Sequence, residues 1–166
     1  MLKKSVFILI GIILLTTNCT RDDICTEETP KTPLLIIKFY DKDNVQFAKA
    51  VENLAVFADT ISFSLFPVST TDSIAIPLKT NENWTDYLFL KNANDSLSFL
   101  GESFRFDYER SDEYINRACA FRTNFFNLTQ ERTTPSPDFE WIDTIVIRTD
   151  SITPQNQNEP HIRIYH

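Results

Sequence analysis

The chain has 166 residues, with 23 acidic against 16 basic side chains and a formal net charge of −7 at pH 7. No basic patch is present to bind a phosphate backbone, so the composition indicates no nucleic-acid partner. A chain of this length suits one domain of ordinary size, because two domains would each bury too little surface.

The N-terminus has the layout of a secretory signal. Lys3 and Lys4 precede an uninterrupted apolar run of ten residues, Val6 to Leu15, and small polar residues lead to Cys19. A membrane-spanning helix needs about 20 apolar residues, so an uncleaved anchor is the weaker interpretation. A cysteine at the cleavage boundary is typical of a bacterial lipoprotein, although such signals usually place a smaller residue than Asn18 before it. We expect a lipidated Cys19; the alternative is a third structural thiol.

The remaining cysteines predict a disulfide. If Cys19 is lipidated, Cys25 and Cys119 are the two thiols left in an exported, oxidising compartment. Their bond would close a loop of 94 positions (119 − 25). By lowering the entropy of the unfolded chain, such a bond could stabilise the fold by up to about 4 to 5 kcal/mol. A zinc site is disfavoured, because neither cysteine has a CxxC partner and His161 and His166 lie at the far C-terminus. We therefore expect no metal and no cofactor.

Alternating apolar and polar side chains predict strands along most of the chain. In the first strand Leu35, Ile37 and Phe39 share one face, and Phe104 and Phe106 do so later. The segments predicted as strands are 32–41, 61–66, 72–78, 86–91, 96–100, 103–110, 141–149 and 161–166. Turn-rich clusters separate them at about 8 to 15 residues, the rhythm of a sandwich or barrel. The fold class predicted is all-β, an antiparallel sandwich.

Segment 111–128 fits two structures. Tyr114, Ala118, Phe121 and Phe125 would form a helical stripe, but the same residues fit two strands that carry Cys119 inward. We predict strands, because a disulfide-linked β core suits the surroundings better. Glycine is nearly absent, and only Gly101 follows the signal. Asn and Asp are therefore expected to supply the turns.

No motif for catalysis is present. The chain lacks GxSxG, HExxH and a phosphate-binding glycine loop. Carboxylates that could in principle form a glycosidase pair are Glu27, Glu28, Asp107, Glu109, Asp112 and Glu113. Spread acidic residues on a β protein are more typical of a solvated surface, so we predict that the chain is not an enzyme. The DKDN stretch at 41–44 lacks the glycine and glutamate of a calcium loop and predicts a hairpin turn.

Several segments together resemble a known family. They are DDICTEETPKTPLLIIKFYD, AVENLAVFADT, TTDSIAIPL, RACAFRT and the terminal HIRIYH. The chain resembles a family of small uncharacterised Bacteroidetes lipoproteins of unknown function, most specifically in DICTE and RAC. The resemblance implies a lipid anchor in the outer membrane, facing the periplasm or the cell surface, and implies no activity. Thr20 to Asp23 are similar to the surface-export signal of that phylum; the alternative is a solvated acidic tether.

The same phylum suggests a modification. Asp followed by Ser or Thr and an apolar residue resembles its O-glycosylation sequon, which here makes candidates of Thr60, Ser73, Ser96, Thr144 and Ser151. Each copy lies where a turn is expected to enter a strand, and the same residues are good turn formers, so local turn chemistry is the alternative.

Two function hypotheses follow from this layout. Residues 1–18 would be the signal peptide, 19–32 a lipidated tether and 33–166 a single sandwich domain. The first hypothesis is a structural or accessory module that binds an unknown envelope protein. The opening strands of the chain also resemble the transthyretin-like half of fimbrial anchor lipoproteins. The sandwich could therefore have a transthyretin-like or an Ig-like strand arrangement. The second is a glycan- or small-ligand-binding lipoprotein in which Trp84 and Trp141 stack on the ligand.

Overall fold

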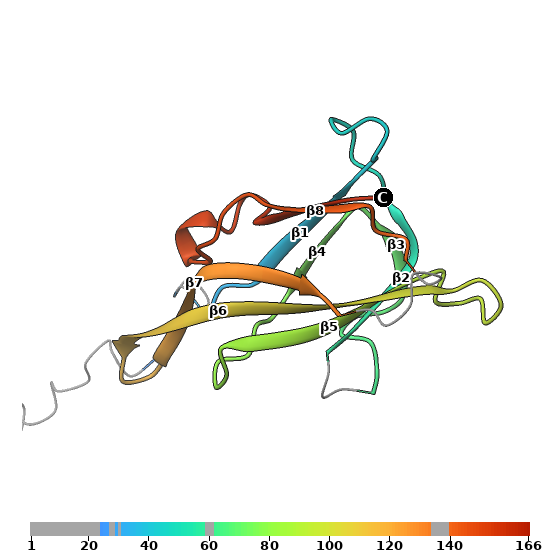
Figure 1. The fold of residues 1–166 in the computed structure, drawn as a ribbon. Coiled ribbons are helices and arrows are strands. Elements are labelled where there is room, and N and C mark those ends of the chain that lie inside the picture. The colour runs from blue at the N-terminus through green and yellow to red at the C-terminus, as the bar shows by residue number, and fades with distance from the viewer. Residues whose placement is uncertain (1–23, 27–28, 30, 59–61, 134–139) are drawn as a thin grey trace, which may run out of the picture.

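The computed structural model describes residues 24–26, 29, 31–58, 62–133 and 140–166. Within these ranges the chain forms nine strands in two sheets and no α-helix, which confirms the all-β prediction (Figure 1). The strands are β1 Leu35–Tyr40, β2 Val51–Ala58, β3 Ser69–Thr71, β4 Ser73–Ile76, β5 Trp84–Lys91, β6 Leu100–Asn116, β7 Ala120–Arg132, β8 Thr144–Ile147 and β9 Ile162–Tyr165, with a 3-10 turn η3 at Pro154–Asn156. None of the described segments is a helix long and apolar enough to cross a bilayer.

The two sheets lie as two layers, consistent with a β-sandwich (Figure 1). One sheet has the order β4-β1-β9-β8 and the other the order β3-β2-β5-β6-β7. The five-stranded sheet is antiparallel throughout. In the four-stranded sheet β1 and β9 pair in parallel, from Ile37 opposite Ile162 to Tyr40 opposite Tyr165. The last strand therefore lies beside the first, and these two strands form the middle of the four-stranded sheet.

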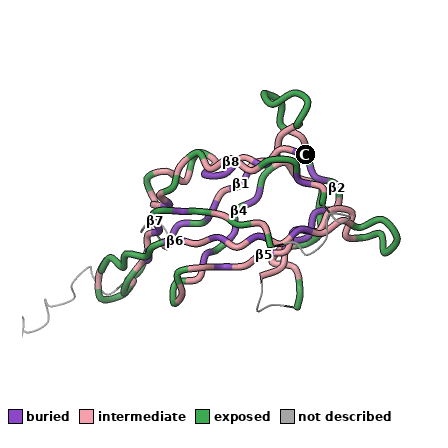
Figure 2. Tube along the Cα trace, in the orientation of Figure 1, coloured by how far each residue is buried: buried purple, intermediate pink, exposed green. Residues whose placement is uncertain are grey.

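The core lies between the layers, where one face of each long strand is apolar. Leu35, Ile37 and Phe39 of β1 are fully buried, as their alternation predicted. On the facing sheet Phe89 and Phe104 pack edge to face with ring centroids 6.1 Å apart. Figure 2 shows the buried residues along the strands of both layers and the exposed ones in the connecting loops.

Segment 111–128 belongs to a long hairpin, which confirms the strand prediction over the helix. β6 and β7 pair along this segment, with Arg110 opposite Phe125 and Tyr114 opposite Phe121. The prediction that these strands carry Cys119 inward is wrong. Cys119 lies in the turn between Asn116 and Ala120 and is half-buried.

The strand predicted at 61–66 is not formed by residues 62–66, which make bends, and Phe63 is 70% exposed. This stretch lies against β2, where the Leu65 N–H donates to the Val56 carbonyl at 2.8 Å and the Val56 N–H donates to Ser64 Oγ. Alternation alone cannot form a strand when the neighbouring edge offers only isolated hydrogen bonds.

The strand predicted at 96–100 is also wrong, because β6 begins only at Leu100. Asp95 holds a turn here: its Oδ1 accepts the Leu97 N–H at 2.9 Å and its Oδ2 accepts the Ser98 hydroxyl at 2.6 Å. These bonds lower the pKa of Asp95, the Ser98 bond most. Asparagine also occupies left-handed backbone positions that most residues disfavour, since Asn53, Asn92 and Asn127 have positive φ.

Candidate functional site: the disulfide-tied tip of the β6–β7 hairpin

The β6–β7 hairpin extends beyond the sandwich (Figure 1). Its ladder runs from Phe104 opposite Arg132 to Asn116 opposite Ala120. Alternate side chains of β6 are buried from Glu102 to Tyr108, but all residues from Glu109 to Tyr114 are exposed. The outer part of the hairpin has no second sheet over it. Its tip, defined as residues 112–122, is therefore available for contacts outside the domain.

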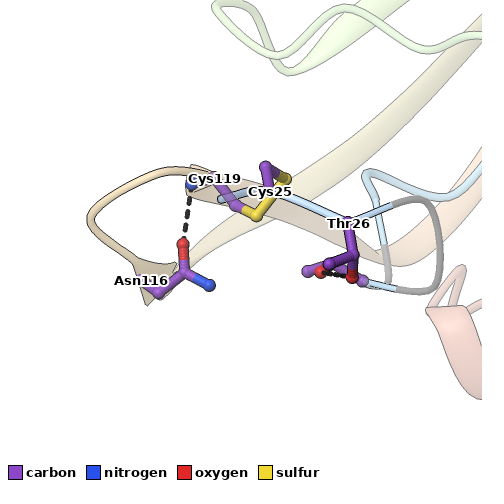
Figure 3. Close-up of a disulfide and its surroundings, with 5 residues drawn as sticks. Cys25, Thr26, Asn116 and Cys119 are labelled. Atoms are coloured by element: carbon purple, nitrogen blue, oxygen red, sulfur yellow. Dashed lines mark hydrogen bonds between the residues drawn. A yellow bond between two sulfur atoms is a disulfide. The ribbon is translucent and has the colours of Figure 1, made fainter. Parts of the chain in front are cut away.

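A disulfide ties the N-terminal segment to this tip. Cys25 and Cys119 are bonded, with an S–S distance of 2.05 Å and Cα atoms 5.0 Å apart, which confirms the predicted pair (Figure 3). Asn116 Oδ1 fixes the turn by accepting the Cys119 N–H at 2.7 Å. The Thr123 N–H donates to Thr32 Oγ1 at 3.1 Å, so the segment before β1 is held to the hairpin at two places.

An aromatic pair stands at the tip. Tyr114 and Phe121 lie opposite each other with ring centroids 5.3 Å apart, edge to face, and are 55% and 65% exposed. Beside them Arg122 Nη2 lies 2.7 Å from Glu113 Oε2. The hydrogen bond from Arg122, and to a smaller extent the one from Asn124, lowers the pKa of Glu113. The tip therefore carries an exposed aromatic pair, and the adjacent cross-strand position holds an ion pair whose two charges balance.

A hollow of about 280 Å³ lies beside the disulfide. It is lined by Cys25, Thr29, Lys31, Thr32, Ile115, Cys119, Phe121 and Arg122. Of its lining residues Phe121 is aromatic and Lys31 is cationic, while Arg122 is paired with Glu113. That combination suits an amphiphilic surface such as lipid headgroups, which carry both apolar and anionic groups.

Trp84, one predicted stacking residue, lies on the outer face of β5, where its neighbour Thr85 points inward and is buried. Two cations cover its ring: Lys79 Nζ lies 4.0 Å and Arg105 Cζ 4.4 Å from the centroid. Asp86 holds Arg105 by two hydrogen bonds of 2.8 Å, and the bond from Arg105 lowers the pKa of Asp86. A sugar would have to displace these cations to stack on the indole.

Trp141, the other predicted stacking residue, packs against the core. Its ring centroid lies 6.3 Å from that of Phe39 and 5.5 Å from that of His166, and its Nε1 donates to the Phe89 carbonyl at 3.4 Å. Because Phe39 and Phe89 are core residues, this indole belongs to the interior side of the sheets. The structure does not bring Trp84 and Trp141 together on one surface.

Sequence analysis missed a buried carboxylate. Glu102 is fully buried, and its Oε1 accepts the main-chain N–H groups of Trp141 and Ile142, both at 2.5 Å. Arg132 Nε lies 3.3 Å from the other carboxylate oxygen. The alternation that buries Phe104 also places Glu102 inward, and that pattern was the available signal. Glu102 holds the chain between β7 and β8 onto β6.

Comparison with known families gives one match. A model described as a family of unknown function, DUF6452, matches residues 53–166, which is 114 of the 166 residues (166 − 53 + 1). The chain belongs to this family. The DUF6452 match contains Cys119 and the whole β6–β7 hairpin, and it begins after Cys25. No curated protein and no solved structure matches the chain.

The histidines of the DUF6452 region are structural in their contacts. His161 Nδ1 accepts the Ile36 N–H at 3.0 Å and its Nε2 donates to Asn156 Oδ1 at 3.0 Å, which ties the start of β9 to β1 and η3. Burial lowers the pKa of both His161 and His166. Among the described residues no three His, Cys, Asp or Glu side chains gather as metal ligands.

The candidate glycosylation residues differ in exposure. Ser73, Ser96 and Thr144 are exposed, Ser151 is half-buried, and Thr60 lies outside the described residues. Ser73 and Thr144 begin β4 and β8, as expected for a turn entering a strand. The Thr144 hydroxyl donates to Asp143 Oδ2 at 2.8 Å, which is the local turn chemistry that serves as the alternative explanation.

Proposed function

We propose that this chain is an exported lipoprotein, anchored in the outer membrane through Cys19, that acts as a structural or accessory protein-interaction module of the cell envelope. The observation that carries the proposal is the disulfide between Cys25 and Cys119. Structural disulfides persist in exported, oxidising compartments. Cys19 and the signal-like segment before it lie outside the described residues, and their sequence supports the anchor.

The two opening cysteines have different roles in this proposal. Two or three acyl chains on Cys19 would hold the chain to the membrane, because each buried methylene contributes about 0.8 kcal/mol. Cys25, six positions later, would fix the tether to the domain. The resemblance to Bacteroidetes lipoproteins supports the outer membrane, and Thr20 to Asp23 support the cell surface over the periplasm.

Exposed apolar side chains at the far end of the domain support a protein partner. β6 has 17 residues, so it spans roughly 50 Å between the β5–β6 turn and the hairpin tip. That turn exposes Leu97 and Phe99, and the β1–β2 loop exposes Val45 and Phe47. Figure 1 places the β5–β6 turn and the hairpin tip at opposite ends of the molecule. A tether at one end would present these apolar residues away from the membrane.

The ligand-binding alternative receives less support. The Trp84 ring is covered by Lys79 and Arg105, and Trp141 packs on the core. A shared stacking platform would need both indoles exposed on one face. The proposal includes no catalysis, no cofactor and no nucleic-acid partner, because the sequence carries no motif and no basic patch for them.

Intact mass spectrometry of the protein purified from its native membrane tests the proposal. We expect an N-terminal Cys19 that carries acyl chains, and a gain of two hydrogens on reduction of the Cys25–Cys119 bond. The matched control is Cys19→Ala. This variant should lack the acyl mass and be absent from the membrane fraction, but it should keep the disulfide. An intact Met1, or Cys19 bonded to Cys25, would contradict the proposal.

We also propose that one or two of the candidate sequon residues are glycosylated in the native host. Ser96 is exposed in a turn and is accessible to a transferase. Peptide mapping of the native protein checks this, with Ser73→Ala, Ser96→Ala and Thr144→Ala as separate variants. Glycan-free peptides at all five residues would contradict it.

A further inference from the structure

The hairpin tip carries an exposed aromatic pair that no described element covers. Tyr114 on β6 and Phe121 on β7 are 55% and 65% exposed, and their rings contact each other at 5.3 Å. A cross-strand aromatic pair stabilises a hairpin locally, but that contact alone leaves more than half of each residue's surface in water. The exposed surface combines an apolar ring with a tyrosine, whose polar end suits a wet boundary.

The disulfide fixes where this pair lies relative to the tether. Cys119 is two residues from Phe121, and its partner Cys25 is six positions after Cys19. Six residues of fully extended chain reach at most about 22 Å. If Cys19 is acylated, as proposed above, its lipid chains enter the bilayer within that distance of Cys25. The tether therefore keeps Cys25, and the tip bonded to it, close to the membrane surface.

The charges at the tip permit close approach to lipid headgroups. Glu113 is neutralised by Arg122, and Asp112 Oδ1 accepts the Thr123 hydroxyl at 2.7 Å. Arg117 in the turn is exposed, and no ion pair to it is found in the part of the chain that the structure describes. Exposed cations next to a membrane are attracted to anionic lipids. The tip, residues 112–122, has two acidic and two basic side chains and so a formal charge of zero, whereas the net charge of the whole chain is −7.

We propose that the hairpin tip is a membrane-contact site, with Tyr114 and Phe121 inserted at the headgroup level of the bilayer that holds the Cys19 anchor. Tyrosine and other amphipathic rings prefer that level, and apolar rings add to the hold of a lipid anchor. The contact would orient the domain, so that β6 points away from the bilayer and the Leu97 end faces outward. The inference rests on the proposed acylation of Cys19.

Fluorescence quenching in membranes tests the contact. Full-length acylated protein with Phe121→Trp is reconstituted in vesicles of phosphatidylethanolamine and phosphatidylglycerol whose acyl chains are brominated near the headgroup. The matched control is Phe47→Trp in the β1–β2 loop, because Phe47 is 64% exposed and Phe121 65%. The wild-type protein supplies the background from Trp84 and Trp141. Tyr114→Trp reports the same contact from the opposite strand, should Phe121→Trp fold poorly.

We expect brominated lipid to quench a larger fraction of the emission of Phe121→Trp and of Tyr114→Trp than of the wild-type emission, and no larger fraction of the emission of Phe47→Trp. Acylated protein in which Phe121→Trp and Phe47→Trp respond alike would overturn the inference and leave the anchor standing. A purified protein without acyl mass would overturn both the anchor and the inference. A blue shift of Phe121→Trp that grows with protein concentration, without lipid quenching, would assign the tip to a second copy instead.

Discussion

Glu102 and Trp141 lie 39 residues apart in the sequence, yet the main-chain N–H of Trp141 donates to the buried Glu102 carboxylate at 2.5 Å. The same oxygen accepts the N–H of Ile142. One inward-facing side chain on β6 therefore replaces the strand partner that residues 141 and 142 lack before β8 begins at Thr144. A buried carboxylate is tolerated there because two main-chain donors satisfy Oε1, and the Arg132 guanidinium, 3.3 Å from Oε2, balances the charge although Oε2 accepts no hydrogen bond from the described residues.

Replacement of Glu102 should be costly. Glu102→Ala leaves two main-chain N–H groups without an acceptor, so we expect the free energy of unfolding to fall by about 2 to 4 kcal/mol in urea denaturation. Glu102→Gln is the matched control, since it keeps an acceptor oxygen and loses only the charge; its loss should be smaller. Equal losses in the two variants would show that the hydrogen bonds are not the dominant contribution.

Loss of the disulfide should separate stability from localisation. Cys25→Ser/Cys119→Ser opens a loop of 94 positions and should lower the free energy of unfolding by up to about 4 to 5 kcal/mol, while the protein stays in the membrane fraction. Cys19→Ser should keep the stability and lose the membrane fraction. Urea denaturation and fractionation measure the two effects. The division of roles fails if all variants lose folding equally.

Stability should fall in mild acid. Burial lowers the pKa of His161 and His166 in the folded state, so below about pH 6.5 the unfolded chain binds protons that the folded chain does not. Their stabilising contribution is present above that pH and is lost as the pH falls, by at most about 1.4 kcal/mol per pH unit for each histidine. Urea denaturation between about pH 7.5 and about pH 5.5 measures the slope. His161→Gln should lower stability and flatten this slope; an unchanged slope would exclude His161 as its source.

A closed hydrogen-bond ring around Thr85 should contribute measurably. The Lys79 N–H donates to Thr85 Oγ1 at 3.0 Å, the hydroxyls of Thr85 and Tyr108 lie 2.6 Å apart, and Tyr108 donates to the Lys79 carbonyl at 3.0 Å. Thr85→Val preserves the side-chain shape and removes the hydroxyl, so thermal or urea unfolding should show a loss of about 1 to 3 kcal/mol. Thr85→Ser keeps the hydroxyl and should lose less. A harmless Thr85→Val would mean that these bonds are replaced by others.

The turn at the hairpin tip contains a strained residue. Ala120 has φ 57°, in the left-handed region that disfavours a side chain with a Cβ. Ala120→Gly should raise the free energy of unfolding by about 0.5 to 1 kcal/mol, because relief of this strain exceeds the entropy that glycine adds to the unfolded chain. Ala118→Gly in the same turn is the control and should show no gain. Destabilisation by Ala120→Gly in urea denaturation would contradict this account.

Local pattern was sufficient to predict much of the fold. Leu35, Ile37 and Phe39 alternate with polar or half-buried neighbours, and strand geometry alone then assigns them to one buried face. The even pair of cysteines left after Cys19 was sufficient to predict the disulfide. The same local reasoning failed at Phe63 and Leu97, whose alternation lies in segments that no strand partner accepts.

Tertiary contacts decided the rest. The parallel pairing of β1 with β9, the burial of Glu102, and the separation of Trp84 from Trp141 depend on segments that are distant in the sequence. Alternation states that a residue faces inward, but it does not state which backbone or ring it meets there. The sequence by itself therefore determined an all-β chain with one disulfide. Only the folded arrangement decided that this disulfide holds the N-terminal segment against an exposed aromatic hairpin tip, because that juxtaposition arises from the length of β6 beyond the second sheet.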